Sequence, residues 1–299
     1  MEDCPSVTAQ HEKTIQYSLI IATLHDDGDL ALCLASLVGQ VDAPMFEVIV
    51  VDQNGDDRLL EVVDQFSGQL LITHERVSFR GASRARNLGG RLARGIWLGF
   101  PDDDCRLLPN ALSEVSRVAR DPQVQVITGQ TIDEAGAPNV LRWKQAPTVF
   151  CRRTMFGCLT EATLFVRRDL FILTGGFDER FGPGAPYPAA EGIDLMHRMF
   201  EHIGSGKACY DPQIKMRHPS KIPPWNRWAV SRFHSYAIGD GALIAKNPKP
   251  HILNWGLRAL VSALLQVFSF KGWKSAAFAA RIVGLFKGFV TYHLASWRK

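Results

Sequence analysis

Residues 17–57 read YSLIIATLHDDGDLALCLASLVGQVDAPMFEVIVVDQNGDD, and this stretch indicates the fold of the chain. Within it, residues 17–23 and 46–51 are short apolar runs rich in β-branched side chains, which is typical of strands buried on both faces of a parallel sheet. Between them, apolar residues recur at helical spacing over residues 30–38. The order strand, helix, strand therefore predicts two parallel neighbours joined by a crossover helix.

The same alternation continues along the chain. We expect helices near residues 59–66 and 83–93. We expect strands at residues 70–73 and 96–100, and the second of these stops at Pro101. The predicted fold class is α/β, with a Rossmann-like, mostly parallel central sheet flanked by helices. In such sheets ligands bind beyond the carboxyl ends of the strands, so the residues that follow each strand form the candidate site.

Polar residues follow three of the predicted strands. No GxGxxG motif follows the first strand and no GxxxxGK[ST] motif occurs in the chain, which disfavours ordinary dinucleotide and P-loop phosphate sites. The polar residues at the strand ends include Thr23, Asp52, Asp102, Asp103 and Asp104.

The three consecutive aspartates at residues 102–104 indicate a metal site. Adjacent carboxylates repel one another at neutral pH unless a cation neutralises them. In extended backbone Asp102 and Asp104 point to the same side, where they are placed to bind Mg²⁺ or Mn²⁺ together with water and substrate phosphates. The alternative interpretation is a solvated acidic turn.

Five segments of the chain together resemble one enzyme family. They are SLIIATLHDDGDLALCLASLVGQ (18–40), EVIVVDQNGDD (47–57), GASRARNLGGRLARG (81–95), WLGFPDDDC (97–105) and GGFDERFGPG (175–184). In order and spacing they resemble the inverting GT-A glycosyltransferases of family 2. The resemblance spans residues 17–220. It implies a GT-A fold and a metal-dependent transfer of sugar, with inversion, from a nucleotide-sugar donor to a hydroxyl group.

The resemblance also implies roles for individual residues. It places Thr23 and Asp52 beside the nucleobase and ribose, where a bare turn is the alternative for Asp52. It identifies Asp104 as a metal ligand, with Asp102 near the ribose or the metal and Asp103 in the nucleotide-sugar site. Residues 84–87 look like the segment that borders the nucleotide pocket, and they contribute Arg84, Arg86 and Asn87. For these three the alternatives are surface ion pairs and an exposed helix position.

The second half of the resemblance should supply the base that accepts the acceptor's proton. The family often places a Glu-Asp pair at the start of a helix after the GGFDE segment. Here Glu191 matches the first acid, Gly192 stands where the second is expected, and Asp194 matches a further acid. Glu191 and Asp194 are the catalytic candidates, and helix capping is the alternative. His218 lies where some GT-A enzymes place a histidine near the metal, and a structural histidine is the alternative.

The C-terminal part of the chain is basic. The chain has a net charge of +4, yet residues 217–299 contain thirteen Lys or Arg residues and one acidic residue. Residues 252–270 and 273–297 place basic side chains among Trp and Phe at helical spacing, which suits amphipathic helices on an anionic membrane surface. The alternatives are packing on the protein itself, a dimer interface or a transmembrane span. No recognisable nucleic-acid module accompanies the charge, so we expect no nucleic-acid partner.

These observations predict the organisation and setting of the chain. We expect a polar tail (residues 1–14), a GT-A domain (15–220) and a basic helical region (221–299). The domain divides into a nucleotide-sugar half (15–130) and an acceptor half (131–220). Residues 1–14 lack the pattern of a signal peptide and the six cysteines form no CxxC pair. We therefore expect a cytoplasmic protein, peripherally associated with the inner face of the cell membrane.

The predicted reaction uses a UDP-, GDP- or dTDP-sugar and a membrane-presented, lipid-linked glycan acceptor. A sugar-phosphate nucleotidyltransferase is an alternative, although a Gly-rich GxGxR-type loop is missing after the first strand. A catalytically silent nucleotide-sugar-binding or scaffold protein is a third interpretation, because the Glu-Asp pair is broken at Gly192.

Overall fold

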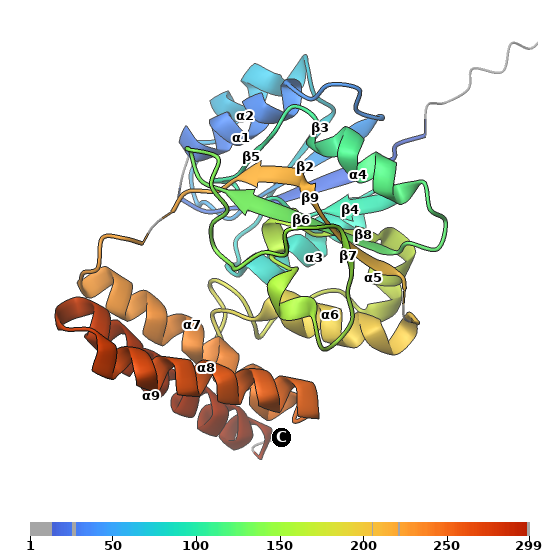
Figure 1. Cartoon of the computed structure of the whole chain (residues 1–299). Coiled ribbons are helices and arrows are strands. Elements are labelled where there is room, and N and C mark those ends of the chain that lie inside the picture. The colour runs from blue at the N-terminus through green and yellow to red at the C-terminus, as the bar shows by residue number, and fades with distance from the viewer. Residues whose placement is uncertain (1–13, 26–27, 205, 221, 298–299) are drawn as a thin grey trace, which may run out of the picture.

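The computed structural model describes residues 14–297 except 26–27, 205 and 221, so nearly all of the predicted polar tail lies outside the described residues. Strands and helices alternate through the first part of the chain (Figure 1). The strands are β1 (Tyr17–Thr23), β2 (Phe46–Asp52), β3 (Ile72–Arg76), β4 (Trp97–Gly99), β5 (Arg106–Leu107), β6 (Val126–Ile132), β7 (Thr148–Val149), β8 (Phe165–Arg167) and β9 (Ala208–Arg217).

Helices cover the sheet and form a separate layer at the C-terminal end. The helices beside the sheet are α1 (Gly28–Val38), α2 (Leu60–Ser67), α3 (Ala82–Leu92), α4 (Ala111–Ala119), α5 (Arg168–Thr174) and α6 (Glu191–His202), with short 3₁₀ turns η1 (Met155–Gly157) and η2 (Glu161–Thr163). The C-terminal helices are α7 (Arg227–Lys246), α8 (Pro250–Ser269) and α9 (Gly272–Ser296).

Among the described residues the strands form one sheet in the order β3-β2-β1-β4-β8-β6-β9-β5, with β7 paired to β9. The strands β3, β2, β1 and β4 are parallel, as the opening stretch of sequence predicts. Beyond β4 the sheet is mixed, because β8 lies antiparallel between β4 and β6, while β6 and β9 are parallel. The predicted α/β class is confirmed.

Two buried clusters fix the helices against the two faces of the sheet. One contains Ile20 and packs beneath α3, and the other contains Leu19 and packs beneath α1. Gly89 allows α3 to approach β1 closely, since a Cβ there would lie 2.3 Å from Ile20 Cγ2. This close packing aligns the start of α3 with the carboxyl ends of the strands.

The third predicted strand is displaced along the chain. The sequence pattern predicts residues 70–73, whereas β3 occupies Ile72–Arg76. The chain turns after α2, and Leu70 is buried in the core without joining the ladder, while Ile72 pairs with Val48. The buried Leu70 therefore extends the apolar sequence pattern into the turn, and the pattern places the start of the strand too early.

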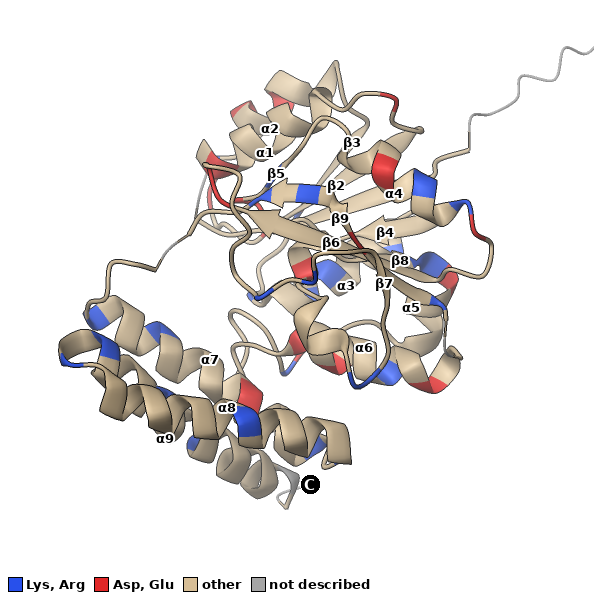
Figure 2. Ribbon diagram, viewed as in Figure 1, with Lys and Arg blue, Asp and Glu red and all other residues tan. Residues whose placement is uncertain are grey.

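The three C-terminal helices lie together below the sheet domain in Figure 1, and Lys and Arg are spread along them in Figure 2. Glycines let α7 and α9 pack with their backbones close together: a Cβ at Gly241 would lie 2.0 Å from the Leu285 carbonyl oxygen. In the same way, a Cβ on Gly239 of α7 would lie 2.5 Å from the Ala189 carbonyl oxygen. The helices therefore rest directly on the loop that leads into α6.

Candidate functional site

The carboxyl ends of β1 and β2 present a buried polar pair. Thr23 ends β1 opposite Asp52 of β2, and both side chains are buried. Asp52 accepts hydrogen bonds from the Asn54 backbone N–H (2.8 Å) and side chain (2.9 Å), and His74 Nε2 lies 3.1 Å from its second oxygen. These contacts hold the carboxylate in one orientation beyond the strand end, where a polar ligand would meet it.

The aspartate run follows β4, next to β1. Burial and the charges of Asp102 and Asp104 raise the pKa of Asp103 to about 6, while the nearby Thr23 hydroxyl lowers it. Although it lies beside Asp103, that hydroxyl makes no hydrogen bond of standard geometry among the described residues. The carboxylates thus crowd one edge of the sheet, which favours a bound cation.

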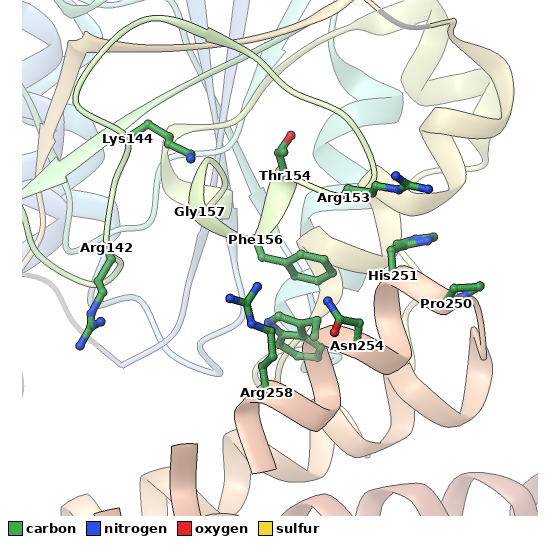
Figure 3. Close-up of a pocket in the computed structure, with 11 residues that line it drawn as sticks. Arg142, Lys144, Arg153, Thr154, Phe156, Gly157, Pro250, His251, Asn254 and Arg258 are labelled. Atoms are coloured by element: carbon green, nitrogen blue, oxygen red, sulfur yellow. The ribbon is translucent and has the colours of Figure 1, made fainter. Parts of the chain in front are cut away.

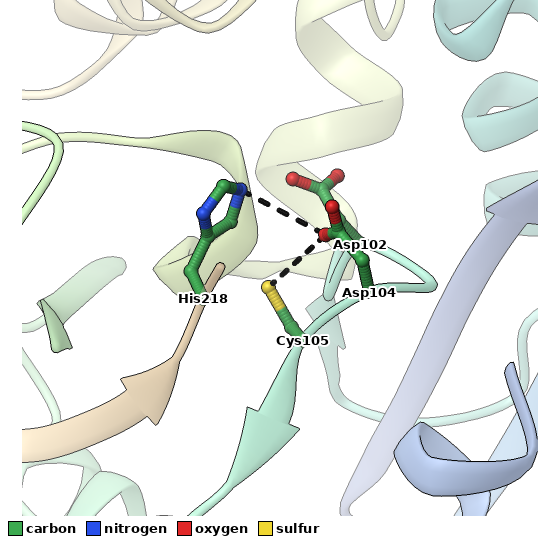
Figure 4. Close-up of side chains that lie close together, drawn as sticks. All are labelled: Asp102, Asp104, Cys105 and His218. Atoms are coloured by element: carbon green, nitrogen blue, oxygen red, sulfur yellow. Dashed lines mark hydrogen bonds and ion pairs between the residues drawn. The ribbon is translucent and has the colours of Figure 1, made fainter. Parts of the chain in front are cut away.

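Four potential metal ligands meet at this edge (Figure 4). One donor atom from each of Asp102, Asp104, Cys105 and His218 lies within 4.8 Å of the others. His218 follows β9, and its Nε2 lies 3.7 Å from Asp104 Oδ1. Asp102, Asp104 and His218, which were predicted from distant parts of the sequence, are thereby brought together.

The chemistry of this donor set fits Mg²⁺ or Mn²⁺. Carboxylate oxygens suit both ions, and an imidazole nitrogen favours Mn²⁺. The thiol of Cys105 is a poor match for these ions, because burial and the Asp102 and Asp104 charges raise its pKa well above the usual range. We therefore regard the two carboxylates and the imidazole as the ligands that the site offers.

Arg86 joins the aspartate run to α6. From α3 its Nη2 donates to Asp102 Oδ1 at 2.6 Å and its Nη1 donates to Glu191 Oε1 at 3.2 Å. Burial opposes the charge on this guanidinium, but the two carboxylates raise its pKa above the ordinary range. Arg86 is therefore a fixed positive charge between the strand edge and the acids of the second half.

The two predicted catalytic acids on α6 have different surroundings. Glu191 begins the helix after Ala190, whose φ of 70° is unusual for a residue with a Cβ. Burial and the neighbouring Glu161 raise the pKa of Glu191 to about 7, although Arg86 lowers it. Asp194 is fully buried and faces other partners: Arg198 (2.9 Å), Lys246 (2.6 Å) and Asn247 (3.2 Å).

The predicted nucleotide-pocket residues on α3 make contacts with the GGFDE segment. The Asn87 side chain accepts from the Phe177 backbone N–H (2.8 Å) and donates to the Phe177 carbonyl (2.9 Å). Arg84 is half exposed, lies over the Phe79 ring and reaches Glu179 at 4.0 Å. Asn87 therefore holds the second half of the domain against α3, and Arg84 is available at the surface.

Two further parts of the chain lie near the same site, and of their residues sequence reasoning singled out only Trp228, as an aromatic side chain that could stack on a sugar. Glu161 of η2 accepts a hydrogen bond from the Gly192 backbone N–H at 2.7 Å. On α7, Arg232 lies over the rings of Trp228 and Tyr236, at 5.2 and 4.4 Å from their centroids. These three residues form the α7 strip. No short motif marks η2 or the α7 strip. The missing acid at Gly192 was nevertheless a signal that another part of the chain supplies a carboxylate.

A separate cleft lies between α8 and the segment that contains η1 (Figure 3). Its volume is about 1020 Å³, and its floor includes Phe156 stacked on Trp255 with ring centroids 5.0 Å apart. None of its lining residues is acidic, and within the described part of the chain no acid pairs with its Arg or Lys side chains. We call it the cationic cleft; its basic residues are Arg142, Lys144, Arg153, His251 and Arg258.

The side of α8 beyond this cleft is apolar and exposed. Of the described helices, α8 has the length and composition that would allow it to span a membrane, and only 17% of that segment is buried. A shallow groove along α8 is lined by Leu257, Arg258, Val261, Ser262, Leu265 and Gln266. The exposed apolar residues of α8 are Leu253, Leu257, Val261, Leu264, Leu265 and Phe268.

Comparison with known proteins places this site in context. A 115-residue stretch is 35% identical to hyaluronan synthase from Pasteurella multocida, covering 37% of this chain and 12% of that protein. Across the curated relatives that the chain matches, the shared stretch spans between 12% and 38% of their lengths. These likenesses therefore concern only part of each protein.

Solved structures of two proteins share the fold over most of the chain. S. aureus TarS 1–349, in complexes with UDP and with UDP-GlcNAc, covers 94% of this chain and 92% of its own length at 16% identity, with TM-scores of 0.56 and 0.55. The mannosyltransferase PcManGT from Pyrobaculum calidifontis, in complex with GDP-Man and Mn²⁺, covers 91% of this chain and 86% of its own length at 15% identity, with a TM-score of 0.62. The sequence profile of glycosyl transferase family 2 matches residues 18–179, which is more than half of the chain, and the chain belongs to this family.

Proposed function

We propose that this protein transfers a sugar, with inversion, from a nucleotide-sugar donor to a hydroxyl group of a glycan acceptor. The observation that carries the proposal is the meeting of Asp102, Asp104 and His218 at the carboxyl edge of the sheet. Ligands bind at this edge in parallel α/β sheets, and the donor set suits a cation that binds diphosphate. Membership of glycosyl transferase family 2 supports the same reaction.

The donor half, about residues 15–130, would hold the nucleotide-sugar. Thr23 and Asp52 offer a hydroxyl and an oriented carboxylate to the nucleobase and ribose. Asp102 and Asp103 border the ribose and diphosphate, with Arg84 at the rim. The two structural neighbours bind UDP, UDP-GlcNAc or GDP-Man, which supports a nucleotide-sugar without choosing among UDP-, GDP- and dTDP-sugars.

Asp102, Asp104 and His218 would hold Mg²⁺ or Mn²⁺ beside the diphosphate. When bound, the ion neutralises charge that develops on the leaving nucleoside diphosphate. Arg86 contributes a second positive charge from the protein and fixes Asp102 relative to Glu191. The neighbour PcManGT contains Mn²⁺, which supports a divalent ion of this kind.

The acceptor half, about residues 131–220, would meet the acceptor together with α7. Tyr236 lies close enough to Glu191, Asp102 and Glu161 to sense their charges, and partial removal of its hydroxyl group from water raises its pKa to about 12. Exposed aromatic rings such as Trp228 and Tyr236 are suited to stacking on sugar rings. The acceptor sugar would therefore lie between the α7 strip and the acids at the start of α6.

The basic helical region, residues 221–299, would dock the enzyme on the inner face of the cell membrane. The exposed apolar side of α8 would enter the interface between lipid head groups and chains, as amphipathic helices do. The cationic cleft lies beside it and offers positive charge to phosphate groups. A lipid-linked acceptor would suit both surfaces, because it carries a phosphate and an apolar chain in one molecule.

The test is release of nucleoside diphosphate from UDP-, GDP- and dTDP-sugars with Mn²⁺ and a panel of lipid-linked glycans. We expect release with one donor class, and loss of release in Asp104→Ala. Asp169→Asn, which changes an exposed aspartate on α5, is the matched control. Pyrophosphate formed from a nucleoside triphosphate and a sugar phosphate would indicate a nucleotidyltransferase instead. Donor binding without turnover would indicate the silent binding protein.

A further inference from the structure

The carboxylate of Glu161 occupies the space that a side chain on Gly192 would need. A Cβ built on Gly192 would lie 2.2 Å from Glu161 Oε1 and 2.8 Å from its Cδ. The Gly192 backbone N–H donates to Oε1 at 2.7 Å, so this oxygen is held at the first turn of α6. A helix N-terminus favours a negative charge in this position. Gly192 thus admits a carboxylate that comes from 31 residues earlier in the chain.

The surroundings of Glu161 are the groups of the candidate site. Its charge acts on Glu191, on Arg86 and on Tyr236, which belong to α6, α3 and α7. The side chain is partly exposed, and within the described residues its second oxygen, Oε2, makes no hydrogen bond. One oxygen is therefore fixed by the backbone, while the other is left without a hydrogen bond among the described residues.

We propose that Glu161 is the catalytic base of the sugar transfer proposed above, on which this inference rests. Its carboxylate accepts the proton of the acceptor hydroxyl while that oxygen forms a bond to the anomeric carbon of the donor. The bond from the anomeric carbon to the diphosphate oxygen breaks, and its electron pair leaves with the nucleoside diphosphate. The carboxyl then loses the proton to water, which restores the starting state.

The two predicted acids on α6 are less suited to this step. Glu191 is 5% exposed and its Oε1 is bound by Arg86, which sits between it and Asp102. Asp194 is wholly buried among Arg198, Lys246 and Asn247. A general base must be within reach of a proton on the substrate, and of the three carboxyl groups Glu161 best combines a fixed position with exposure.

Glu161 also influences the protonation of its neighbour. The groups that face Glu191 are Glu161 from η2, Arg86 from α3, Asp102 after β4 and Tyr236 from α7. Burial and the Glu161 charge favour the neutral form of Glu191, and Arg86 opposes them. Removal of the Glu161 charge should therefore lower the pH at which Glu191 ionises, which tests whether the two carboxyl groups share one site.

The first test compares Glu161→Gln with the matched control Glu134→Gln, which changes an exposed glutamate after β6. Measured with the active donor, Mn²⁺ and acceptor, kcat of Glu161→Gln should fall by about 10²- to 10⁴-fold, the usual contribution of a general base. Donor affinity should change less than threefold, and the control should keep both values. Wild-type kcat in Glu161→Gln would overturn the proposal, as would an equal loss of donor binding.

A second test relocates the carboxylate. Gly192→Ala keeps every charge but places a methyl group where Oε1 lies, so kcat should fall at least tenfold while donor affinity is retained. Glu161→Ala combined with Gly192→Asp supplies an acid from α6 and should recover at least tenfold over Glu161→Ala alone. Full activity of Gly192→Ala would contradict the proposed position of the base.

The proposed function and this inference can fail separately. Turnover by wild type with unchanged kcat in Glu161→Gln rejects only the base. If wild type releases no nucleoside diphosphate, the proposed function fails. In that case titration of ¹³C-labelled glutamates still decides whether Glu161 and Glu191 share one site. The Glu191 resonance should titrate at lower pH in Glu161→Gln, and an unchanged titration would overturn the coupling on which the inference depends.

Discussion

Lys246 Nζ lies 2.6 Å from Asp194 Oδ1, and this ion pair joins the last turn of α7 to the first turn of α6. The same ammonium lies 2.7 Å from Asp178 in the GGFDE segment. One lysine of the C-terminal helices therefore pairs with two carboxylates, one in the GGFDE segment and one on α6. Replacement of this lysine should therefore lower the free energy of unfolding more than it lowers the rate of catalysis.

We expect Lys246→Met to destabilise the protein by about 3 kcal/mol, because it leaves the buried Asp194 with one cationic partner fewer. Thermal unfolding of Lys246→Met, Asp194→Asn and the double variant measures the coupling between the two residues. The double variant should lose less free energy of unfolding than the sum of the losses in the two single variants. Simple additivity would show that the pair contributes nothing beyond its separate parts.

Removal of a metal ligand should abolish stabilisation by Mn²⁺. In wild type, Mn²⁺ and a nucleoside diphosphate should raise the melting temperature. In Asp104→Asn the same addition should leave the melting temperature unchanged. Cys105→Ser should retain the rise, since the Cys105 thiol stays protonated and is not needed as a ligand. Differential scanning fluorimetry checks both variants, and a full response in Asp104→Asn would refute the metal site.

Asp240 on α7 should make stability depend on pH. Burial raises its pKa to about 6, although Arg281 of α9 lies 3.4 Å away and lowers it. An acid whose pKa is higher in the folded than in the unfolded state contributes most stability at low pH, and this contribution is lost as pH rises from about 4 to 6.

Asp240→Asn removes that dependence. Between pH 4.5 and pH 7.5, the free energy of unfolding of the variant should rise relative to that of wild type by on the order of 1 to 2 kcal/mol. This value is reduced because the Asp240 side chain is 16% exposed. Urea unfolding of both proteins at the two pH values gives the difference. Parallel behaviour of the two proteins would mean that Asp240 is ionised throughout.

Leucines on α8 should decide membrane binding. Leu257 and Leu265 are 59% and 63% exposed, so replacement of both by Gln should leave the fold intact. We expect at least a tenfold loss of sedimentation with anionic liposomes, with donor binding unchanged. Leu173→Gln on α5, which changes a leucine that is 64% exposed, is the control. Unchanged sedimentation would reject α8 as the docking surface.

The first half of the fold follows from local sequence, and the second does not. The parallel strands β1, β2 and β4 are readable because each is an apolar run followed by polar residues. By contrast, the antiparallel place of β8 between β4 and β6 depends on long-range pairing.

The site divides in the same way. Asp102, Asp104 and His218 each follow a strand, so position in the sequence is enough to nominate them. Two partners of Asp194, in contrast, are Lys246 and Asn247, which lie more than fifty residues later in the chain. Glu161 has no motif, and its place is defined only by the absent side chain at Gly192. Sequence reasoning finds residues that are marked by a local pattern, such as a position directly after a strand. It misses residues that come together only through tertiary packing.

The contact between Gly239 and Ala189 leaves no room for even a methyl group, so α7 packs directly on the loop before Glu191. For an enzyme docked through α8, this direct packing would set the height of the transfer chemistry above the lipid surface. The folded protein between α8 and the site would then set the distance from the membrane to the site, as a flexible tether would not. Only acceptor hydroxyls presented at that height would be extended, and glycans of other lengths would pass unmodified.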